Sequence, residues 1–85
     1  MGQLDDTARL LLQEMGHLAQ DNPTVEFLPS KAAENLDLNP FSPEYRAALD
    51  HLVALGDIVR TPHRNHYQLT PKGSNRVRDI RWWRS

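Results

Sequence analysis

Apolar residues recur at regular intervals along the chain, and these intervals predict most of its secondary structure. Near the N-terminus, Leu4, Ala8, Leu11 and Met15 follow one another at gaps of four and three residues. Such gaps place the side chains on one stripe of an amphipathic helix. The pattern therefore predicts a first helix from about residue 4 to 20, which ends at the sequence DNP.

A second helical pattern occupies the middle of the chain. Tyr45 and Leu49 belong to a series with three- and four-residue spacing, which is typical of a helix packed on one side. Ser42 precedes the series and can accept a hydrogen bond from the first helical turn as an N-cap. Gly56 follows it and suits the left-handed conformation in which many helices end. We therefore expect a helix from about residue 43 to 55.

Shorter patterns predict the remaining elements. Val25 and Phe27 alternate with polar neighbours, as in a very short strand. A proline then opens a short helix over about residues 29–37. The runs DIVRT and HYQLT flank PHRN and predict a β-hairpin over residues 57–69. The sequence TP, a cap followed by a first helical residue, begins a last helix over about residues 71–83.

Composition limits the class of protein. A chain of 85 residues predicts a single domain, residues 1–85. The absence of cysteine excludes disulfide frameworks, thiolate zinc sites and cysteine nucleophiles. The first residues carry acids where a signal peptide would carry basic residues, and no apolar run is long enough to cross a bilayer. We therefore expect a cytoplasmic protein that has no membrane partner.

The net charge of −1 conceals an asymmetry between the two parts of the chain. Residues 1–56 hold three basic and nine acidic residues, whereas residues 57–85 hold seven basic and two acidic residues. Such a division indicates a surface that faces a polyanion, although the two parts could equally neutralise each other. Binding of a duplex requires that the basic hairpin and the basic C-terminal segment lie on one flank, beside the amino end of the helix at 43–55.

The order of the predicted elements, together with the runs AALDHLVALGDIVR and YQLTPKG, is similar to that of bacterial winged-helix regulators. The resemblance covers about residues 28–73 well and the first helix loosely. It implies a mostly helical α+β fold, with a three-helix core, a short strand, a hairpin as the wing, and a C-terminal helix. It also implies a helix-turn-helix DNA-binding protein, a small regulator of transcription, with the helix at 43–55 in the major groove and the wing on the backbone or minor groove.

The connection DLNPFSPE departs from this resemblance, because it is roughly two residues longer than the usual helix-turn-helix spacing. A longer connection changes the tilt of the following helix. Phe41, within it, can either pack there or stay partly exposed.

The candidate DNA-binding residues are those that the resemblance leaves exposed on the helix and hairpin. Arg46 can bond guanine edges, with Glu44 or Asp50 orienting it, but one arginine among acids also fits a solvated helix face. Arg64 at the hairpin tip can contact phosphate, although charged tips also protect hairpins from aggregation. The full candidate set is Lys31, Ser42, Glu44, Arg46, Ala47, Arg60, His63, Arg64, Asn65, His66 and Lys72.

The C-terminal sequence RVRDIRWWRS suggests a dimer or partner interface. Its candidate residues are Val77, Ile80, Trp82 and Trp83. Adjacent tryptophans point about 100° apart on a helix, so one of them is expected at a surface or interface. A homodimer contact, capping of the core and stacking against nucleic acid are three alternative roles.

Other kinds of chemistry find little support in the sequence. His63 and His66 form an H-x-x-H pair that could be half of a metal site, but His17 and His51 lie on other predicted elements. No nucleophile elbow, glycine-rich phosphate loop or H-E-x-x-H motif occurs, so we expect no metal, cofactor or enzymatic activity. The alternative function is a winged-helix module for protein–protein assembly without DNA binding, which the acidic N-terminal part favours.

Overall fold

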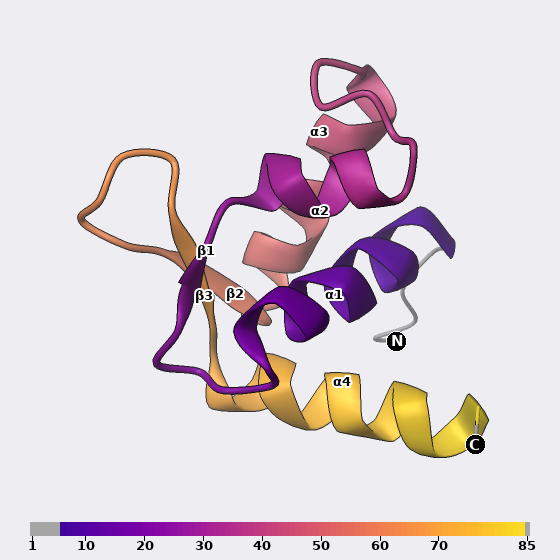
Figure 1. The fold of residues 1–85 in the computed structure, drawn as a ribbon, viewed down its shortest axis with the longest axis vertical. Coiled ribbons are helices and arrows are strands. Elements are labelled where there is room, and N and C mark those ends of the chain that lie inside the picture. Colours follow the sequence, from indigo (N-terminus) through magenta and orange to yellow (C-terminus); the bar gives the residue numbers. More distant parts are fainter. Residues whose placement is uncertain (1–5, 85) are drawn as a thin grey trace.

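The computed structural model of the chain describes residues 6–84, and it describes side chains for residues 6–80. In chain order the elements are α1 (Asp6–Ala19), β1 (Glu26–Phe27), α2 (Pro29–Asn35), α3 (Pro43–Ala54), β2 (Ile58–Arg60), β3 (Tyr67–Leu69) and α4 (Pro71–Arg84) (Figure 1). The described chain is therefore an α+β structure, mostly helical, with four helices and one small sheet. The expected start of the first helix, at residue 4, lies outside the described residues.

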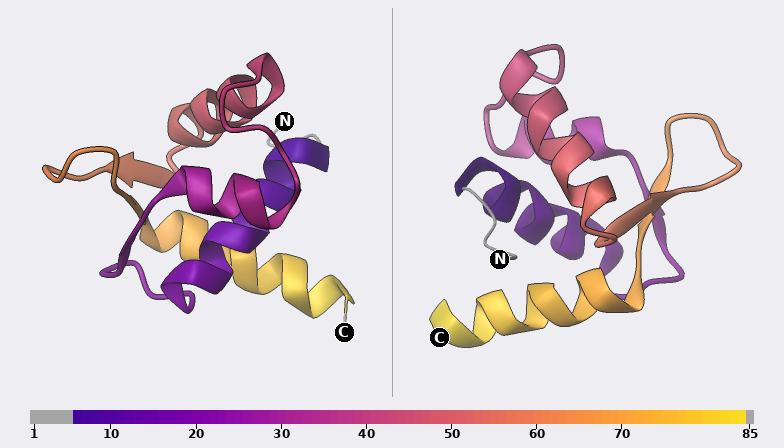
Figure 2. Two further views of the ribbon diagram at one scale, coloured as in Figure 1. Left: turned by 45° about the horizontal axis from the view of Figure 1, so that its top comes forward. Right: turned by 180° about the vertical axis from the view of Figure 1, so that it is seen from behind.

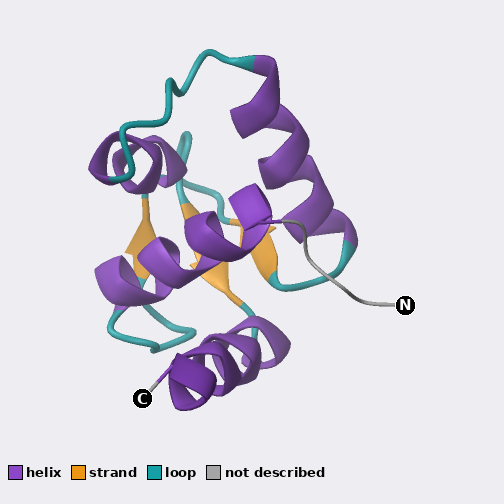
Figure 3. Ribbon diagram, turned by 90° about the vertical axis from the view of Figure 1, so that its right-hand side faces the viewer, coloured by secondary structure: helices purple, strands orange, loops and turns teal. Residues whose placement is uncertain are grey.

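The three strands form one antiparallel sheet in the order β1-β3-β2, so the last strand of the chain lies in the middle. Phe27 pairs with Tyr67, and Ile58 pairs with Leu69. Helix α1 lies across one face of the sheet, and α4 lies beyond α1 at the edge of the molecule (Figure 3). Residues 61–66, the hairpin loop, join β2 to β3 and extend away from the helices (Figure 1).

Helix α1 is the centre of the hydrophobic core because it contacts the three other described helices and the strands β1 and β3. The stripe predicted from the sequence is the face that it buries. Fully burying a leucine, isoleucine or methionine stabilises a fold by about 1.5–3 kcal/mol. The packing of side chains around α1 therefore contributes more to the stability of the fold than the hydrogen bonds of the short sheet. The fully buried side chains of the core include Ala8, Leu11, Leu12, Met15 and Leu52. None of the helices in the described chain has the length and apolar character needed to span a membrane.

Asp57 connects three elements at the point where α3 ends and β2 begins. The residue is fully buried. Its N–H donates to the Leu52 carbonyl at 3.0 Å, and its carbonyl accepts from the Thr70 N–H at 3.0 Å. Its Oδ2 lies 2.6 Å from Nε of Arg76 on α4. The end of α3, the start of β2 and the first half of α4 are therefore held together by one residue.

The sequence LTPKG places α4 against this same point. Thr70 caps the helix, because its Oγ1 accepts from the Gly73 N–H at 3.0 Å and donates to the Gly56 carbonyl. Gly56 has φ of +79°, the left-handed conformation expected for it. Gly73 allows the backbone of α4 to touch that of Asp57, since a Cβ at position 73 would lie 1.9 Å from the Asp57 carbonyl oxygen.

Gly73→Ala is expected to destabilise the protein, because the new methyl group would overlap the backbone of Asp57 and force α4 to move. Overpacking of this kind costs about 1–3 kcal/mol or more. Urea unfolding followed by circular dichroism measures the loss. Asn75→Ala, at an exposed position of the same helix, is the control and should change the free energy of unfolding by less than about 0.5 kcal/mol. An unchanged midpoint for Gly73→Ala would contradict the close contact.

Asp57→Asn is expected to lower the free energy of unfolding by about 3–5 kcal/mol, because it leaves the guanidinium of Arg76 without its buried anion. Asp50→Asn is the matched control, since Asp50 also pairs with an arginine, Arg46, but both side chains are well exposed. Loss of that exposed pair should cost no more than about 1 kcal/mol. Equal midpoints for the two variants would show that burial of the Asp57 pair contributes nothing.

Candidate functional site

A groove of about 680 Å³ lies between α2, the first half of α3 and the hairpin. It brings together three of the residues predicted from the sequence: Arg46 from α3, Arg60 from β2 and Asn65 from the hairpin loop. On the opposite wall, α2 contributes Ser30 and Glu34. Figure 2 shows the hairpin projecting beside α3 in both views. The groove is the place where basic and apolar side chains from distant parts of the sequence meet.

The side of the groove toward the core is aromatic. Tyr45 is buried, with 8% of its surface exposed, and Tyr67 is partly buried against the core. Burial raises the pKa of the Tyr45 phenol above its ordinary value of 10.0, and the nearby Tyr67 adds to the increase. The phenol of Tyr45 therefore remains protonated at neutral pH and keeps its capacity to donate a hydrogen bond.

Phe41 is the most prominent residue at the rim of the groove, with 92% of its surface exposed. It does not pack in the long connection before α3. The turn that carries it is well fixed, because its N–H donates to Oδ1 of Asn39 at 2.9 Å and Ser42 Oγ donates to the Asn39 carbonyl at 2.7 Å. Leu28, at the start of α2, is 40% exposed and lines the same groove. Sequence reasoning did not identify either residue as a candidate site residue.

The exposed face of α3 matches the prediction in its composition. Glu44, Arg46, Ala47 and Asp50 are all exposed. Arg46 Nε lies 3.7 Å from Asp50 Oδ2, and both side chains are well exposed, so this pair contributes at most about 1 kcal/mol and leaves Arg46 free to exchange partners.

Ser42 has a structural task at the start of α3. Its Oγ accepts from the Tyr45 N–H at 3.2 Å, which confirms it as the N-cap. The side chain is half-buried, and its hydroxyl also bonds the preceding turn. Its expected contact with DNA therefore competes with two intramolecular hydrogen bonds.

The hairpin loop is anchored to β1 by a carboxylate. Glu26 Oε1 accepts from Thr61 Oγ1 at 2.9 Å and lies 2.7 Å from Nδ1 of His63. The hydrogen bond from His63, followed by that from Thr61, lowers the pKa of Glu26 below its ordinary value of 4.5. These contacts join the loop to a strand more than thirty residues earlier in the chain, and no sequence pattern suggested them.

Internal hydrogen bonds fix the backbone of the loop. Nδ1 of His66 lies 2.8 Å from the Arg64 carbonyl, and Asn65 adopts a left-handed conformation with φ of +62°. The His66 N–H donates to the His63 carbonyl at 3.1 Å. Both histidines of the H-x-x-H pair are therefore used in loop geometry, and the described residues contain no group of three or more side chains suited to a metal ion.

Arg60 and Arg64 are the two exposed arginines of the hairpin. Within the described residues, neither guanidinium makes an ion pair or hydrogen bond. Arg60 lies in β2 and lines the groove, whereas Arg64 lies in the hairpin loop. Both positive charges are available to an external anion.

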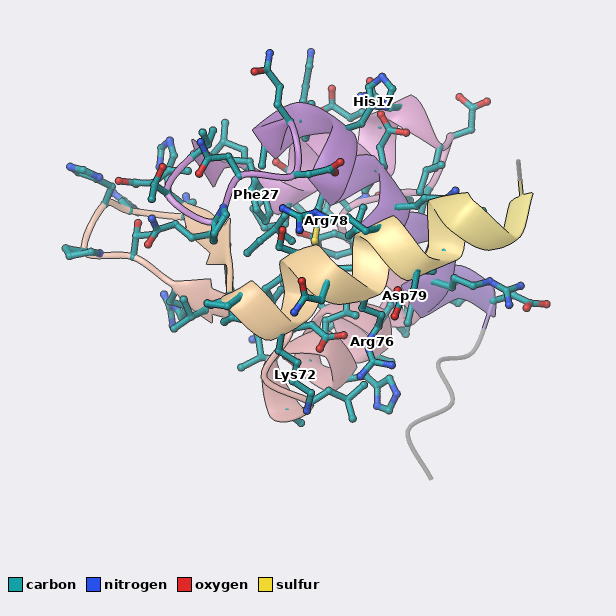
Figure 4. The ribbon with its side chains drawn as sticks, turned by 90° about the horizontal axis from the view of Figure 1, so that it is seen from below. His17, Phe27, Lys72, Arg76, Arg78 and Asp79 are labelled. Carbon is teal, nitrogen blue, oxygen red and sulfur yellow. The ribbon has the colours of Figure 1, made fainter. Side chains whose placement is uncertain are left out.

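The other basic residues do not join this surface. Figure 4 shows Lys72 and Arg76 on the side of α4 that faces α3, with Arg78 on the opposite side. Lys72 Nζ donates to the Leu55 carbonyl at the end of α3 at 2.7 Å, and Arg76 pairs with the buried Asp57. Lys31 is exposed on α2 outside the lining of the groove.

The expectation that the basic hairpin and the basic C-terminal segment share one flank is wrong. The hairpin loop and the C-terminal end of α4 point to opposite ends of the molecule (Figures 1 and 2). The reason is that α4 runs under α1 and away from the hairpin, with Arg76 and Lys72 tied to the end of α3. The basic residues among the described ones that line the groove beside the first half of α3 are Arg46 and Arg60, so a combined basic surface of the hairpin and the C-terminal segment is not formed.

The predicted partner interface on α4 is only partly described. Val77 is fully buried against α1, where its Cγ1 would lie 2.6 Å from a Cβ at Gly16, so it belongs to the core rather than to a partner surface. Ile80 is partly buried and packs on the same core. Trp82 and Trp83 lie beyond the described side chains.

Protonation of Glu26 is expected to release the hairpin loop. Because the pKa of Glu26 is lowered in the folded protein, the folded state favours the charged carboxylate, and the anchor is fully present above pH 4.5. It is lost as the pH falls through the lowered pKa. NMR spectra of the amides of Thr61 and of residues 63–66, recorded from pH 7 downward, should show the release, and Glu26→Gln should show part of it already at pH 7. Glu34→Gln, at an exposed position of α2, is the control. Identical loop dynamics in the two variants would contradict the anchor.

The site therefore consists of an exposed helix face, an anchored hairpin with two arginines that have no partner among the described residues, and a groove with an apolar rim between them. The chain matches no protein-family model, no curated protein and no solved structure.

Proposed function

We propose that the chain is a winged-helix DNA-binding protein, a small regulator of transcription. The order of elements supports this proposal, because a hairpin follows α3 and its second strand pairs with the short β1 in the order β1-β3-β2. In this arrangement α3 lies in the major groove and the hairpin is the wing that contacts the backbone or the minor groove.

Because the C-terminal basic segment lies away from the hairpin, the proposal rests on a smaller surface than the sequence led us to expect, and its carrying observation is the pair of guanidinium groups on an anchored hairpin beside an exposed helix face. Arg60 and Arg64 have no anionic partner among the described residues, and the loop between them is held by Glu26. Phosphate contacts from such residues supply sequence-independent affinity. This affinity falls as the salt concentration rises, because the release of counterions from DNA on binding then contributes less free energy. Because the backbone of the hairpin is fixed before binding, little conformational entropy is lost when it meets DNA.

The helix face supplies the sequence preference in this proposal. Arg46 donates to a guanine edge, and Glu44 or Asp50 accepts from a cytosine amino group. Ala47 offers a methyl group to thymine. Since the face carries two acids for one arginine, it contributes discrimination between sequences rather than affinity.

Lys72, His63 and His66 have smaller parts in this proposal. The ammonium group of Lys72 bonds the end of α3 and sits at the opposite end of that helix from Ser42. The two histidines shape the loop. Lys31 on α2 and Asn65 in the hairpin loop remain candidates for contact with phosphate.

A second candidate function is protein–protein assembly, and Phe41 favours it. The side chain of Phe41 is 92% exposed, and its phenyl group cannot form a hydrogen bond or ion pair with phosphate. Aromatic side chains are, however, enriched at protein interfaces. A dimer through the C-terminal helix remains compatible with either function.

The salt dependence of duplex binding tests the DNA proposal. Fluorescence anisotropy with a pool of labelled duplexes measures the association constant at each salt concentration. This constant should fall as salt rises from 50 to 200 mM, by about 10³-fold if six phosphate contacts are made. Arg60→Ala and Arg64→Ala should each reduce the slope of log K against log salt by about one, because each removes one phosphate contact.

Arg78→Ala is the matched control, since Arg78 is an exposed arginine on the far side of α4, and its slope should equal that of the unmodified protein. An absence of binding at 50 mM salt, or equal effects of all three substitutions, would overturn the proposed DNA surface.

A further inference from the structure

We propose that the groove between α2, α3 and the hairpin is a docking site for a segment of a partner protein, one that carries a bulky apolar side chain next to carboxylates. The docking itself is independent of DNA binding. Its consequence for DNA rests on the proposed function, because the two ligands would share arginines.

The apolar part of the segment fits the outer end of the groove. Phe41 and Leu28 line it from two different connections, and both expose apolar surface, 92% and 40% respectively. Leu49 and Tyr45, two buried residues of α3, line the same groove. A monomer gains nothing from presenting such groups to water, whereas a partner side chain placed between them removes apolar surface on both sides from water.

The turn that presents Phe41 is suited to binding because it is rigid before any partner arrives. Asn39 accepts hydrogen bonds through its side chain from the Phe41 N–H and through its carbonyl from Ser42 Oγ. Pro40 and Pro43 restrict the backbone on both sides. An anchor held in this way loses little conformational entropy on binding, which is the property of aromatic residues that dominate interface energies.

The charge of the groove selects carboxylates and sets the direction of the segment. Arg60 lines the hairpin wall without an anionic partner among the described residues, and Arg46 has only the exposed pair with Asp50. Glu34 is the one acid in the lining, and it lies on the α2 wall. A carboxylate is therefore attracted to the hairpin side and repelled from the α2 side, so the apolar side chain enters between Leu28 and Phe41 while its acidic neighbours face Arg60.

These features favour a protein segment over nucleic acid as the occupant. A phosphate backbone can contact Arg60, but it gains nothing from Leu28 and Phe41. A protein segment that combines apolar and acidic side chains uses both parts of the groove at once. Because Arg46 and Arg60 belong to both surfaces, occupation of the groove would prevent the proposed contact of α3 and the hairpin with DNA.

The test uses the full chain labelled with ¹⁵N and a blocked heptapeptide with a central tryptophan, two acidic residues on each side and glycine ends. Titration to millimolar peptide should shift the amide signals of Ser30, Arg46, Arg60 and Tyr67 in a saturable way. A peptide with lysine in place of every acid, and one with alanine in place of tryptophan, should bind at least about fivefold more weakly, which corresponds to about 1 kcal/mol. No saturable shift at these amides, or equal binding of the lysine peptide, would overturn the proposal.

Two substitutions locate the contacts. Phe41→Ala should weaken the acidic peptide by roughly fivefold or more, as expected for an interface anchor, and its high exposure means that the fold should not suffer. A further peptide carries asparagine or glutamine in place of each acid. The unmodified protein should bind the acidic peptide more tightly than this amide peptide, and Arg60→Ala should remove that difference. Leu10→Ala, at an exposed apolar position on α1 (41%), and Arg78→Ala on α4 are matched controls that should bind as the unmodified protein does.

Nucleic acid is the competing occupant, and a single-stranded oligothymidylate of eight nucleotides is its probe. If this oligonucleotide shifted the Phe41 and Tyr67 amides and the acidic peptide did not, the docking proposal would be overturned in favour of base stacking. Displacement of a labelled duplex by the peptide tests the shared arginines separately. A failure of duplex binding leaves the peptide titration fully informative, so the two proposals can fail independently.

Discussion

The buried carboxylate of Asp57 is the constraint on which the rest of the structure depends. Removing an ion from water costs several kcal/mol even after relaxation, and here Arg76 offsets this cost by pairing with the buried carboxylate. The amide and carbonyl of Asp57 bond the end of α3 and the start of α4, and only glycine at position 73 allows α4 to come this close. Once these elements are joined, the direction of the hairpin relative to α3 is determined, because β2 begins at the next residue.

This constraint also explains how the charges of the chain divide into two groups. The C-terminal part has most of the basic residues, but Arg76 neutralises Asp57 in the interior and Lys72 bonds the last turn of α3. These two cations stabilise the junction and are not available to a ligand. Arg60 and Arg64 lie beyond the junction on the hairpin, and the acid that contacts the loop, Glu26, is engaged by Thr61 and His63. Among the described side chains, the hairpin therefore carries two exposed arginines, whereas Arg78 of α4 is exposed on the side away from α3.

Local patterns in the sequence were sufficient for the elements and insufficient for the site. The spacing of Leu11 and Met15 on α1 follows from burial of one face of that helix, and Ser42 and Gly56 act through their immediate neighbours, so each was predictable. The pairs Asp57–Arg76 and Glu26–His63 join residues far apart in the chain, and no local periodicity encodes such pairs. For the same reason the basic C-terminal segment was placed on the wrong flank. Phe41 was ambiguous because an aromatic residue between prolines fits equally well into a core or at a surface.

The groove shows how long-range contacts of this kind create a site. One wall is the turn that Asn39 holds, and the other is the hairpin whose loop Glu26 holds. The turn and the loop lie outside the hydrophobic core, whereas Ile58 and Leu69 at the base of the hairpin belong to it. Each wall is stabilised by hydrogen bonds whose strength depends on a polar side chain, so the walls can respond to solvent conditions while the core stays intact. The apolar rim and the arginines face the same space because β3 pairs with both β1 and β2, which places the hairpin next to the start of α2. A surface with anchored arginines alone would serve any polyanion. Because Phe41 and Leu28 add apolar contacts, the groove favours a protein segment over a phosphate backbone.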